Sequence, residues 1–219
     1  WQRTLDDALG LSPAEAERLS QPRPALPATE RLLQDRPEHI VPRPPGEQLA
    51  ADNRWGFKLR QPEHLYHRGE LYNLSISRGT LNDEERYKIN EHIVQTIKML
   101  EALPFPSHLK NVPEIAGGHH ERMDGKGYPR GLAGAGMSPQ ARMMAIADVF
   151  EALTADDRPY KPGKRLSEAL TIMRRMVAEG HLDAELFALF LSSGVCLVYA
   201  RQFMLPDMVD VADVGAYLS

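Results

Sequence analysis

The chain has 219 residues, of which 42% are hydrophobic and 26% are charged, and its formal net charge is −4. The length suits one domain with an extension, and the composition is that of a globular protein. The negative balance excludes a global basic field that would recruit nucleic acid polymers or an anionic membrane. The single Cys196 excludes an internal disulfide and indicates a reducing compartment, and its apolar neighbours predict a buried small hydrophobe.

Proline is concentrated before residue 69, where nine of the seventeen prolines lie. Such stretches favour extended conformations that link domains or cover a surface. One helix interrupts them, with Ser12 as N-cap, Pro13 as first residue and Glu15 as capping-box partner. We therefore divide the chain into a Pro-rich, mostly irregular segment at 1–68 and a helical domain at 69–219.

The first long helix is predicted between residues 81 and 103. Asn82 is its N-cap, and Glu85 follows three residues later as in a capping box. Apolar residues at helical spacing form a stripe that we expect to face the core. The stripe consists of Ile89, Ile93, Ile97 and Leu100.

Four more helices follow, and each has a start or a stop signal. Ser138 caps one helix, and a second runs from Ser167 to a stop at Gly180. Asp183 caps a third, and a last helical stretch follows Gly194. The apolar run of these last two helices is broken by Ser-Ser-Gly, which indicates two core helices and not a membrane span. Because no alternating strand pattern of useful length is present, the sequence predicts an all-α fold.

Two polar residues lie in apolar helical surroundings. Asp148 is part of "MMAIADVFEAL", a helix that we expect to be buried on most sides. A carboxylate there is costly unless it is paired with an Arg or bound to a cation. His92 shares a broad face with the core stripe and is either a satisfied core histidine or a ligand.

The stretch "IAGGHHERMDGKGYP" contains two adjacent histidines, His119 and His120. Adjacent side chains in a regular helix point about 100° apart. They converge on one ion where the backbone departs from a helix, and we expect Gly117-Gly118 to provide that freedom. Neutral imidazoles suit Fe, Mn, Ni or Zn. Together with His92 and Asp148 on other helices, the pair predicts a buried metal site, the alternative being a structural pair.

Two loops carry basic side chains beside turn-forming residues. "ERMDGKGYPRG" has Lys126 and Arg130 at its tip, and "TADDRPYKPGKR" has Arg158 and Lys161 three residues apart. Arg presents a planar fork to phosphate oxygens and Lys a point charge. Each loop is therefore either an ordinary solvated connection or part of a phosphate-binding site.

The segments "HHERMDGKGYPRGL" and "ARMMAIADVFEALTADDRPYK" resemble the HD-GYP branch of the HD phosphohydrolase superfamily, over residues 79 to 190. The resemblance implies an HD-type helical bundle with two or three divalent ions, most often Fe or Mn. It implies a bacterial cytoplasmic signalling enzyme, a phosphodiesterase that hydrolyses cyclic di-GMP or a related 3′,3′-cyclic dinucleotide.

The resemblance also assigns roles to the metal-site candidates. His92, His119 and His120 match histidine ligands and are expected to hold one metal. Asp148 matches a final aspartate that is expected on the other metal, where it belongs to the catalytic centre.

For the substrate, the resemblance assigns Arg158 and Lys161 to catalytic contacts with the phosphates. Gly127, Tyr128 and Pro129 are the GYP motif itself, which we expect in the substrate-binding loop and in contacts with GGDEF-domain proteins. A homodimer is compatible with the sequence.

One part of the family pattern is missing. The family needs a His-Asp dyad upstream of His92, and this chain contains no His-Asp dipeptide. At the usual spacing stand Glu63-His64, which could act as metal ligands, with His67 three residues on, where the family often has Lys. Alternatively, the dyad lies further upstream before a helical insertion, which would fit a chain that opens at Trp1 without Met. We favour truncation over loss of the dyad.

Two other interpretations remain open. In the first, the chain is a catalytically inactive HD-GYP module that binds a cyclic dinucleotide or a GGDEF partner. In the second, it is a helical scaffold with a histidine-rich core and no metal.

Overall fold

The computed structural model describes residues 1–19, 22–156 and 162–218. The chain forms two compact units. Unit 1 consists of Trp1–Asn53 and Arg60–Asn90, and unit 2 consists of Arg54–Leu59 and Glu91–Ser219. The domain boundary that we place between residues 68 and 69 stays a prediction.

Unit 1 contains short elements joined by irregular chain. Two antiparallel strand pairs, β1–β2 and β3–β4, lie among them, and the second pair shifts register between Val41 and Pro42. The predicted capping box of Ser12 and Glu15 is confirmed in α1. The elements are β1 (Gln2–Arg3), α1 (Pro13–Ala16), β2 (Ala28–Thr29), β3 (Ile40–Pro42), β4 (His64–His67) and α2 (Glu70–Leu74).

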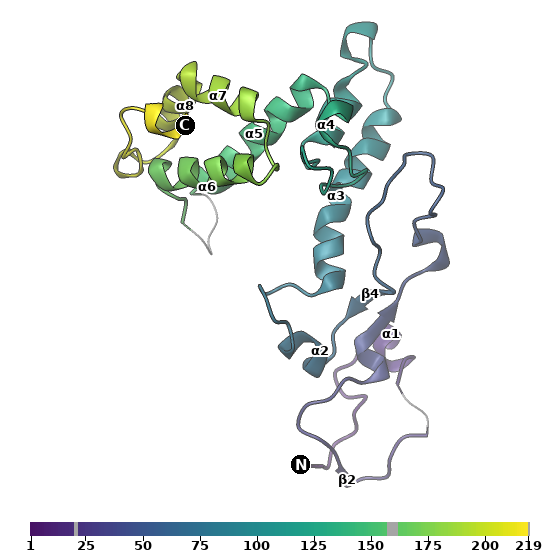
Figure 1. Ribbon diagram of the computed structural model, residues 1–219. Helices are drawn as coiled ribbons and strands as arrows, with labels where there is room; N and C mark the ends of the chain where they lie inside the picture. The colour runs from purple at the N-terminus through teal and green to yellow at the C-terminus, as the bar shows by residue number, and fades with distance from the viewer. Residues whose placement is uncertain (20–21, 157–161, 219) are drawn as a thin grey trace. The chain divides into compact units, whose positions relative to one another are not determined.

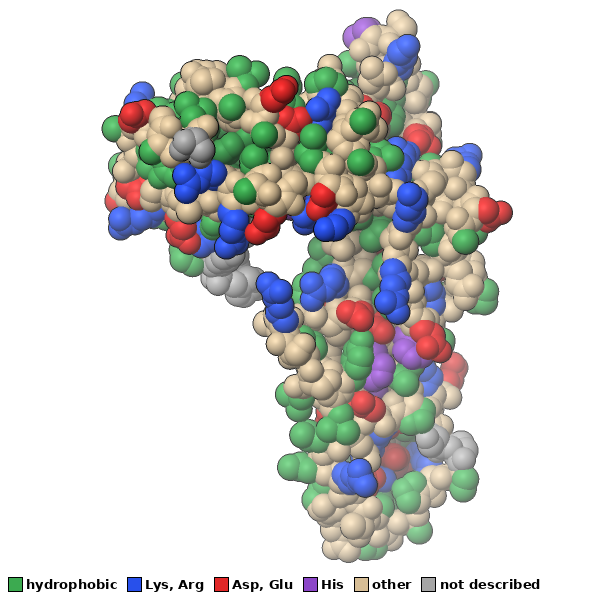
Figure 2. Space-filling model, in the orientation of Figure 1, with side chains coloured by type: hydrophobic (Ala, Val, Ile, Leu, Met, Phe, Trp, Pro, Cys, Tyr) green, Lys and Arg blue, Asp and Glu red, His purple; other side chains and the backbone are tan. Residues whose placement is uncertain are grey.

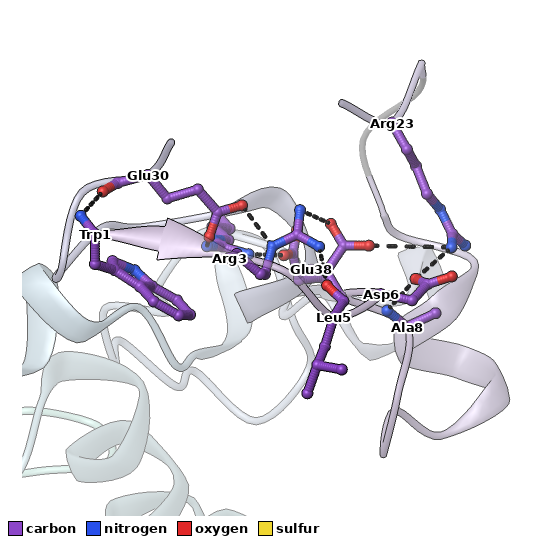
Figure 3. A network of polar contacts seen from close by, with 10 residues as sticks. Trp1, Arg3, Leu5, Asp6, Ala8, Arg23, Glu30 and Glu38 are labelled. Carbon is purple, nitrogen blue, oxygen red and sulfur yellow. Dashed lines mark hydrogen bonds and ion pairs between the residues drawn. The ribbon is translucent and has the colours of Figure 1, made fainter. Parts of the chain in front are cut away.

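Ion pairs hold the first forty residues of unit 1 together (Figure 3). The buried Arg3 donates from Nε to Glu30 Oε1 at 2.8 Å, and Arg36 Nη2 lies 2.6 Å from Glu30 Oε2. The hydrogen bond from Arg3 lowers the pKa of the Glu30 carboxyl. Arg23 pairs with Asp6 at 3.0 Å. This Pro-rich segment therefore has specific side-chain contacts of its own.

Three helices begin where the capping signals predict, whereas the helix predicted from Ser167 begins at Leu166. Asn82 Oδ1 accepts from Glu85 N at 2.9 Å, and Ser138 and Asp183 cap α5 and α7. The remaining bounds are α3 (Asp83–Glu101), α4 (Val112–Gly118), α5 (Pro139–Thr154), α6 (Leu166–Ala178), α7 (Ala184–Ser192) and α8 (Val195–Phe203). The described part of the chain is mostly helical, which confirms the predicted all-α class.

The main core of unit 2 lies between α5, α6, α7 and α8, which pack around one another in Figure 1. Leu166, Leu170 and Met173 from α6 are fully buried. Cys196 on α8 is also fully buried, and burial raises the pKa of its thiol. The predicted small hydrophobe is confirmed.

Two expectations about burial are wrong. The α5 helix buries one face only, because Met143 and Met144 are 47% and 40% exposed on the other. Ile89 is 54% exposed, although Ile93 and Ile97 of the same predicted stripe are fully buried. Both errors have one cause. Each of these helices has more apolar side chains than neighbouring elements cover, so some of them face solvent.

The apolar run after Asp183 is divided as predicted, since α7 ends at Ser192 and α8 begins at Val195. Among the described residues, no single helix has the length and hydropathy needed to cross a membrane. Helices α7 and α8 have this length and hydropathy only when they are taken together, and their axes are bent by 64° to one another.

The charged side chains are of mixed sign on the face shown in Figure 2. Lys and Arg are interspersed there with Asp and Glu, in line with the net charge of −4. This face therefore has the mixed-charge surface of an ordinary globular protein.

Helix α4 packs very closely on its neighbours because of two glycines. Gly117 and Gly118 are both buried within α4, so the expectation that they free the backbone from helical geometry is wrong. A Cβ at Gly117 would lie 2.5 Å from Cγ1 of Ile97 on α3. A Cβ at Gly118 would lie 2.9 Å from Cβ of Ala141 on α5. The glycines therefore provide close approach and not a break in the helix.

The replacement Gly117→Ala should destabilise unit 2. Alanine is the better helix former, but its methyl group would overlap the fully buried Ile97 side chain. Overpacking of this kind costs about 1–3 kcal/mol. Urea unfolding should show this loss, whereas Gly136→Ala, whose Cβ would meet Leu132 at an ordinary 3.8 Å, should change the free energy of unfolding little. A Gly117→Ala protein as stable as the parent would contradict the close-approach explanation.

Candidate metal centre

Three histidines from two segments converge in unit 2. His92 lies on α3, and His119 and His120 follow directly after the end of α4. Their ligand nitrogens all lie within 4.8 Å of one another. The Nε2 atoms of His92 and His120 are 3.1 Å apart. The structure thus brings together the three histidines that the sequence singles out.

The tautomer of His119 follows from its hydrogen bond. Its Nδ1 lies 2.7 Å from the carbonyl oxygen of Ala116. A carbonyl oxygen only accepts, so Nδ1 is the donor, and in the neutral imidazole Nε2 keeps its lone pair. A second hydrogen bond of this kind is how proteins commonly orient a metal-ligating imidazole.

His120 is kept neutral by its surroundings. Burial lowers the pKa of its imidazole to about 4, and the neighbouring His119 and His92 act in the same direction. The negative charge of Asp148 opposes the shift without cancelling it. A neutral imidazole is the form that binds metals, so His120 is ready to act as a ligand at neutral pH.

Asp148, half-buried on α5, lies close enough to His120 for its charge to act on that ring. Its charge acts on His120, and together with burial, the larger cause, it raises the pKa of the Tyr128 hydroxyl. Among the described residues, the cluster of ligand atoms within 4.8 Å consists of the three histidines and leaves Asp148 outside. Its role as a ligand of a second metal stays a prediction.

The loop that contains Gly127, Tyr128 and Pro129, which we name the GYP loop, covers one side of His120. The Tyr128 ring stacks on the His120 ring, with 4.8 Å between centroids and 22° between planes. The Tyr128 amide also donates to the His120 carbonyl at 3.1 Å. At Gly127 a Cβ would lie 2.5 Å from the Cα of Glu121, so the loop folds back against its own start. Pro129 is fully buried.

Glu121, to which the sequence analysis assigned no role, holds this loop from inside. Its carboxylate is 1% exposed and accepts from the amides of Arg130 at 2.6 Å and Leu132 at 2.7 Å. The backbone donors offset the cost of burying the charge. The only signal in the sequence is a Glu beside the histidines in a loop rich in Gly and Pro, which does not reveal burial.

The residues present fit a divalent transition metal. They offer convergent imidazole nitrogens, one fixed tautomer, one strongly depressed pKa and an acidic neighbour. Such a donor set suits Fe, Zn, Ni or Cu, and the carboxylate of Asp148 extends the choice to Mn.

The structure does not test the other residues that the sequence analysis singled out as site candidates. Arg158 and Lys161 fall in 157–161, outside the residues that the structure describes. Glu63, His64 and His67 belong to unit 1, with the two histidines at the ends of β4. The roles of all five stay predictions.

Comparison with known proteins gives relatives of one enzyme class. The chain is 42% identical over 130 residues to the 3'3'-cGAMP-specific phosphodiesterase 1 of Vibrio cholerae, a match that covers 59% of this chain and 27% of the relative. It is 36% identical over 144 residues to 3'3'-cGAMP-specific phosphodiesterase 3 of the same organism, covering 64% and 30%. A cyclic di-GMP phosphodiesterase of Pseudomonas aeruginosa is 40% identical over 116 residues, covering 52% and 27%. The chain therefore spans less than a third of the length of these relatives.

The profile of the HD domain family matches residues 27–186, a range that includes the histidine cluster, Asp148 and the GYP loop. This match and the relatives confirm the resemblance found in the sequence. Since the profile covers well over half of the sequence, the chain belongs to the HD domain family.

Proposed function

We propose that the protein is a metal-dependent phosphodiesterase of the HD-GYP type that hydrolyses cyclic di-GMP or a related 3′,3′-cyclic dinucleotide. The observation that carries the proposal is the convergence of His92, His119 and His120 beside Asp148 and under Tyr128. Membership of the HD domain family implies metal dependence. The relatives that share this part of the chain are named as phosphodiesterases for cyclic di-GMP or 3'3'-cGAMP.

The side chains divide into metal-binding and substrate-binding groups. The three histidines would hold one ion and Asp148 a second, with Fe or Mn as the preferred metals. Such ions supply Lewis-acid stabilisation of phosphoryl oxygens and lower the pKa of water. The loop that carries Tyr128 restricts access of solvent to the His120 ring, which strengthens electrostatic interactions at the cluster.

Phosphate recognition is assigned to the basic loop after α5. We place Arg158 and Lys161 against the non-bridging oxygens of the substrate, because a guanidinium fork and an ammonium group complement two phosphates. Gly127, Tyr128 and Pro129 complete the substrate side of the site. The exposed Lys126 at the tip of this loop leaves it accessible to a GGDEF-domain protein.

A second candidate function is favoured by one specific observation, the absence of a His-Asp dipeptide in this sequence. In that case the chain binds a cyclic dinucleotide without hydrolysing it. Incubation of the anaerobically purified protein with Fe²⁺ or Mn²⁺ and each dinucleotide, followed by chromatography, separates the two. Linear products support the enzyme, and saturable binding without products supports the binding module.

The replacement Asp148→Ala should lower the metal content per chain. The change removes the carboxylate predicted to bind the second metal, so elemental analysis after anaerobic purification should show loss of an ion. Glu151→Ala, an exposed carboxylate three residues along the same helix, is the matched control and should leave the content unchanged. Equal metal content in both variants would contradict the ligand role of Asp148.

The replacement Arg158→Ala should weaken binding of the dinucleotide without changing the metal content. Losing a charge-assisted hydrogen bond costs about 1.5–3 kcal/mol, which raises Kd roughly 10- to 100-fold. Calorimetric titration with cyclic di-GMP measures this change. Arg201→Ala, which removes an exposed arginine of α8, is the control. An unchanged Kd in Arg158→Ala would contradict the proposal that Arg158 binds a substrate phosphate.

Stability of the metal-free protein should depend on pH through His120. Its pKa is about 4 in the folded chain and 6.5 for the ordinary group, so the unfolded chain binds more protons between these values. The free energy of unfolding should therefore fall as pH is lowered from 6.5 towards 4. In His120→Gln this decline, measured by urea titration in EDTA, should be smaller. The same decline in both proteins would show that the imidazole is not held neutral.

A further inference from the structure

A short segment from the N-terminal part of the chain packs on the GYP loop. Residues 54–59, which we name the strap, belong to unit 2, whereas the residues on both sides of them belong to unit 1. The sequence analysis placed them in the Pro-rich segment. Their contacts therefore connect a distant part of the sequence with the unit that carries the histidine cluster.

Two hydrogen bonds join the backbone of the strap to the end of the loop. The Lys58 amide donates to the carbonyl oxygen of Pro129 at 2.7 Å. Arg130 Nε donates to the carbonyl oxygen of Trp55 at 2.9 Å, across 75 positions of sequence. Pro129 and Arg130 are the two residues that follow Tyr128, so the strap fixes the chain immediately after the tyrosine.

Aromatic and cationic side chains strengthen the contact. The rings of Trp55 and Phe57 are stacked, with centroids 5.7 Å apart and planes 5° apart, and Phe57 is 3% exposed. The Arg130 guanidinium lies 5.8 Å from the Phe57 centroid, and Lys98 Nζ lies 4.9 Å from that of Trp55. Cations at these distances are attracted by aromatic rings.

Glu101, the last residue of α3, links the same two side chains. Its Oε2 accepts from Trp55 Nε1 at 2.8 Å, and its Oε1 lies 3.7 Å from Arg130 Nη2. The strap and the loop are thus attached to the helix that also carries His92. Glu121 holds the Arg130 amide from the inside, and the strap holds its guanidinium from the outside.

We infer that Trp55 and Arg130 are positioning residues, which fix Tyr128 on the ring of His120 and thereby set the geometry of the cluster. Neither residue touches the histidines in the contacts described, and both act through Pro129 and Tyr128. The inference deepens the proposed function and rests on it for its catalytic meaning. The contacts themselves involve only side chains and backbone of this chain, so the test needs neither metal nor substrate.

The test is the NMR signal of the His120 ring protons in metal-free protein with labelled histidine. The stacked Tyr128 ring shifts these protons upfield, and Tyr128→Leu defines their position without that ring. In Trp55→Ala the signal should move most of the way to the Tyr128→Leu position. Trp1→Ala removes the only other tryptophan, which is 59% exposed in unit 1, and should leave the signal in place.

Two milder variants keep the test decisive if Trp55→Ala does not fold. Trp55→Phe keeps a ring but loses the hydrogen bond to Glu101, and Arg130→Met keeps the stem but loses the charge. Each should move the His120 signal in the same direction by a smaller amount. If the signal stays at its parental position in folded Trp55→Ala, or in both milder variants, the inference is overturned, even where the melting temperature falls.

Failure of the inference and failure of the proposed function give different results. If the strap variants displace the His120 signal but the parent hydrolyses no cyclic dinucleotide, the positioning role stands and the proposed phosphodiesterase activity is contradicted. Hydrolysis by the parent together with an unmoved signal in the strap variants removes the positioning role alone.

Discussion

The histidine cluster depends on how closely helix α4 can approach its neighbours. Gly117 and Gly118 present no side chain to Ile97 of α3 and Ala141 of α5, so the end of α4 lies against both helices. His119 and His120 follow that end directly, where their ligand nitrogens meet that of His92 and the charge of Asp148 acts on His120. A larger residue at Gly117 or Gly118 would displace both histidines at once, because packed interiors transmit small displacements.

Burial then determines the chemistry of the converged groups. The same environment that keeps His120 neutral would penalise any unpaired charge near it. The buried carboxylate of Glu121 avoids that penalty by accepting two amides of its own loop, and the Arg130 side chain is held by the strap. The loop over the cluster is thus held from two sides without regular secondary structure.

Local signals in the sequence were informative about the fold and about part of the site. The caps at Asn82, Ser138 and Asp183 depend on neighbouring residues only, and the histidines stood out against their apolar surroundings. What depends on distant partners was not predictable. A Gly-Gly pair can provide a flexible backbone or a close approach between helices, and only the positions of α3 and α5 decide between the two roles. Nothing in the residues 54–59 themselves indicates that they contact Arg130, 75 positions away from Trp55.

The carboxylate of Glu121 also determines how the loop over the cluster can move. Its two oxygens hold the amides of Arg130 and Leu132, so exposing either amide to solvent breaks a charged hydrogen bond inside the protein. Because both amides bind one buried carboxylate, loss of either bond leaves an oxygen of that group without its donor. The segment from Glu121 to Leu132 should therefore open as one cooperative unit and not by fraying from its tip, with hydrogen exchange closer to that of a helix than of a surface turn.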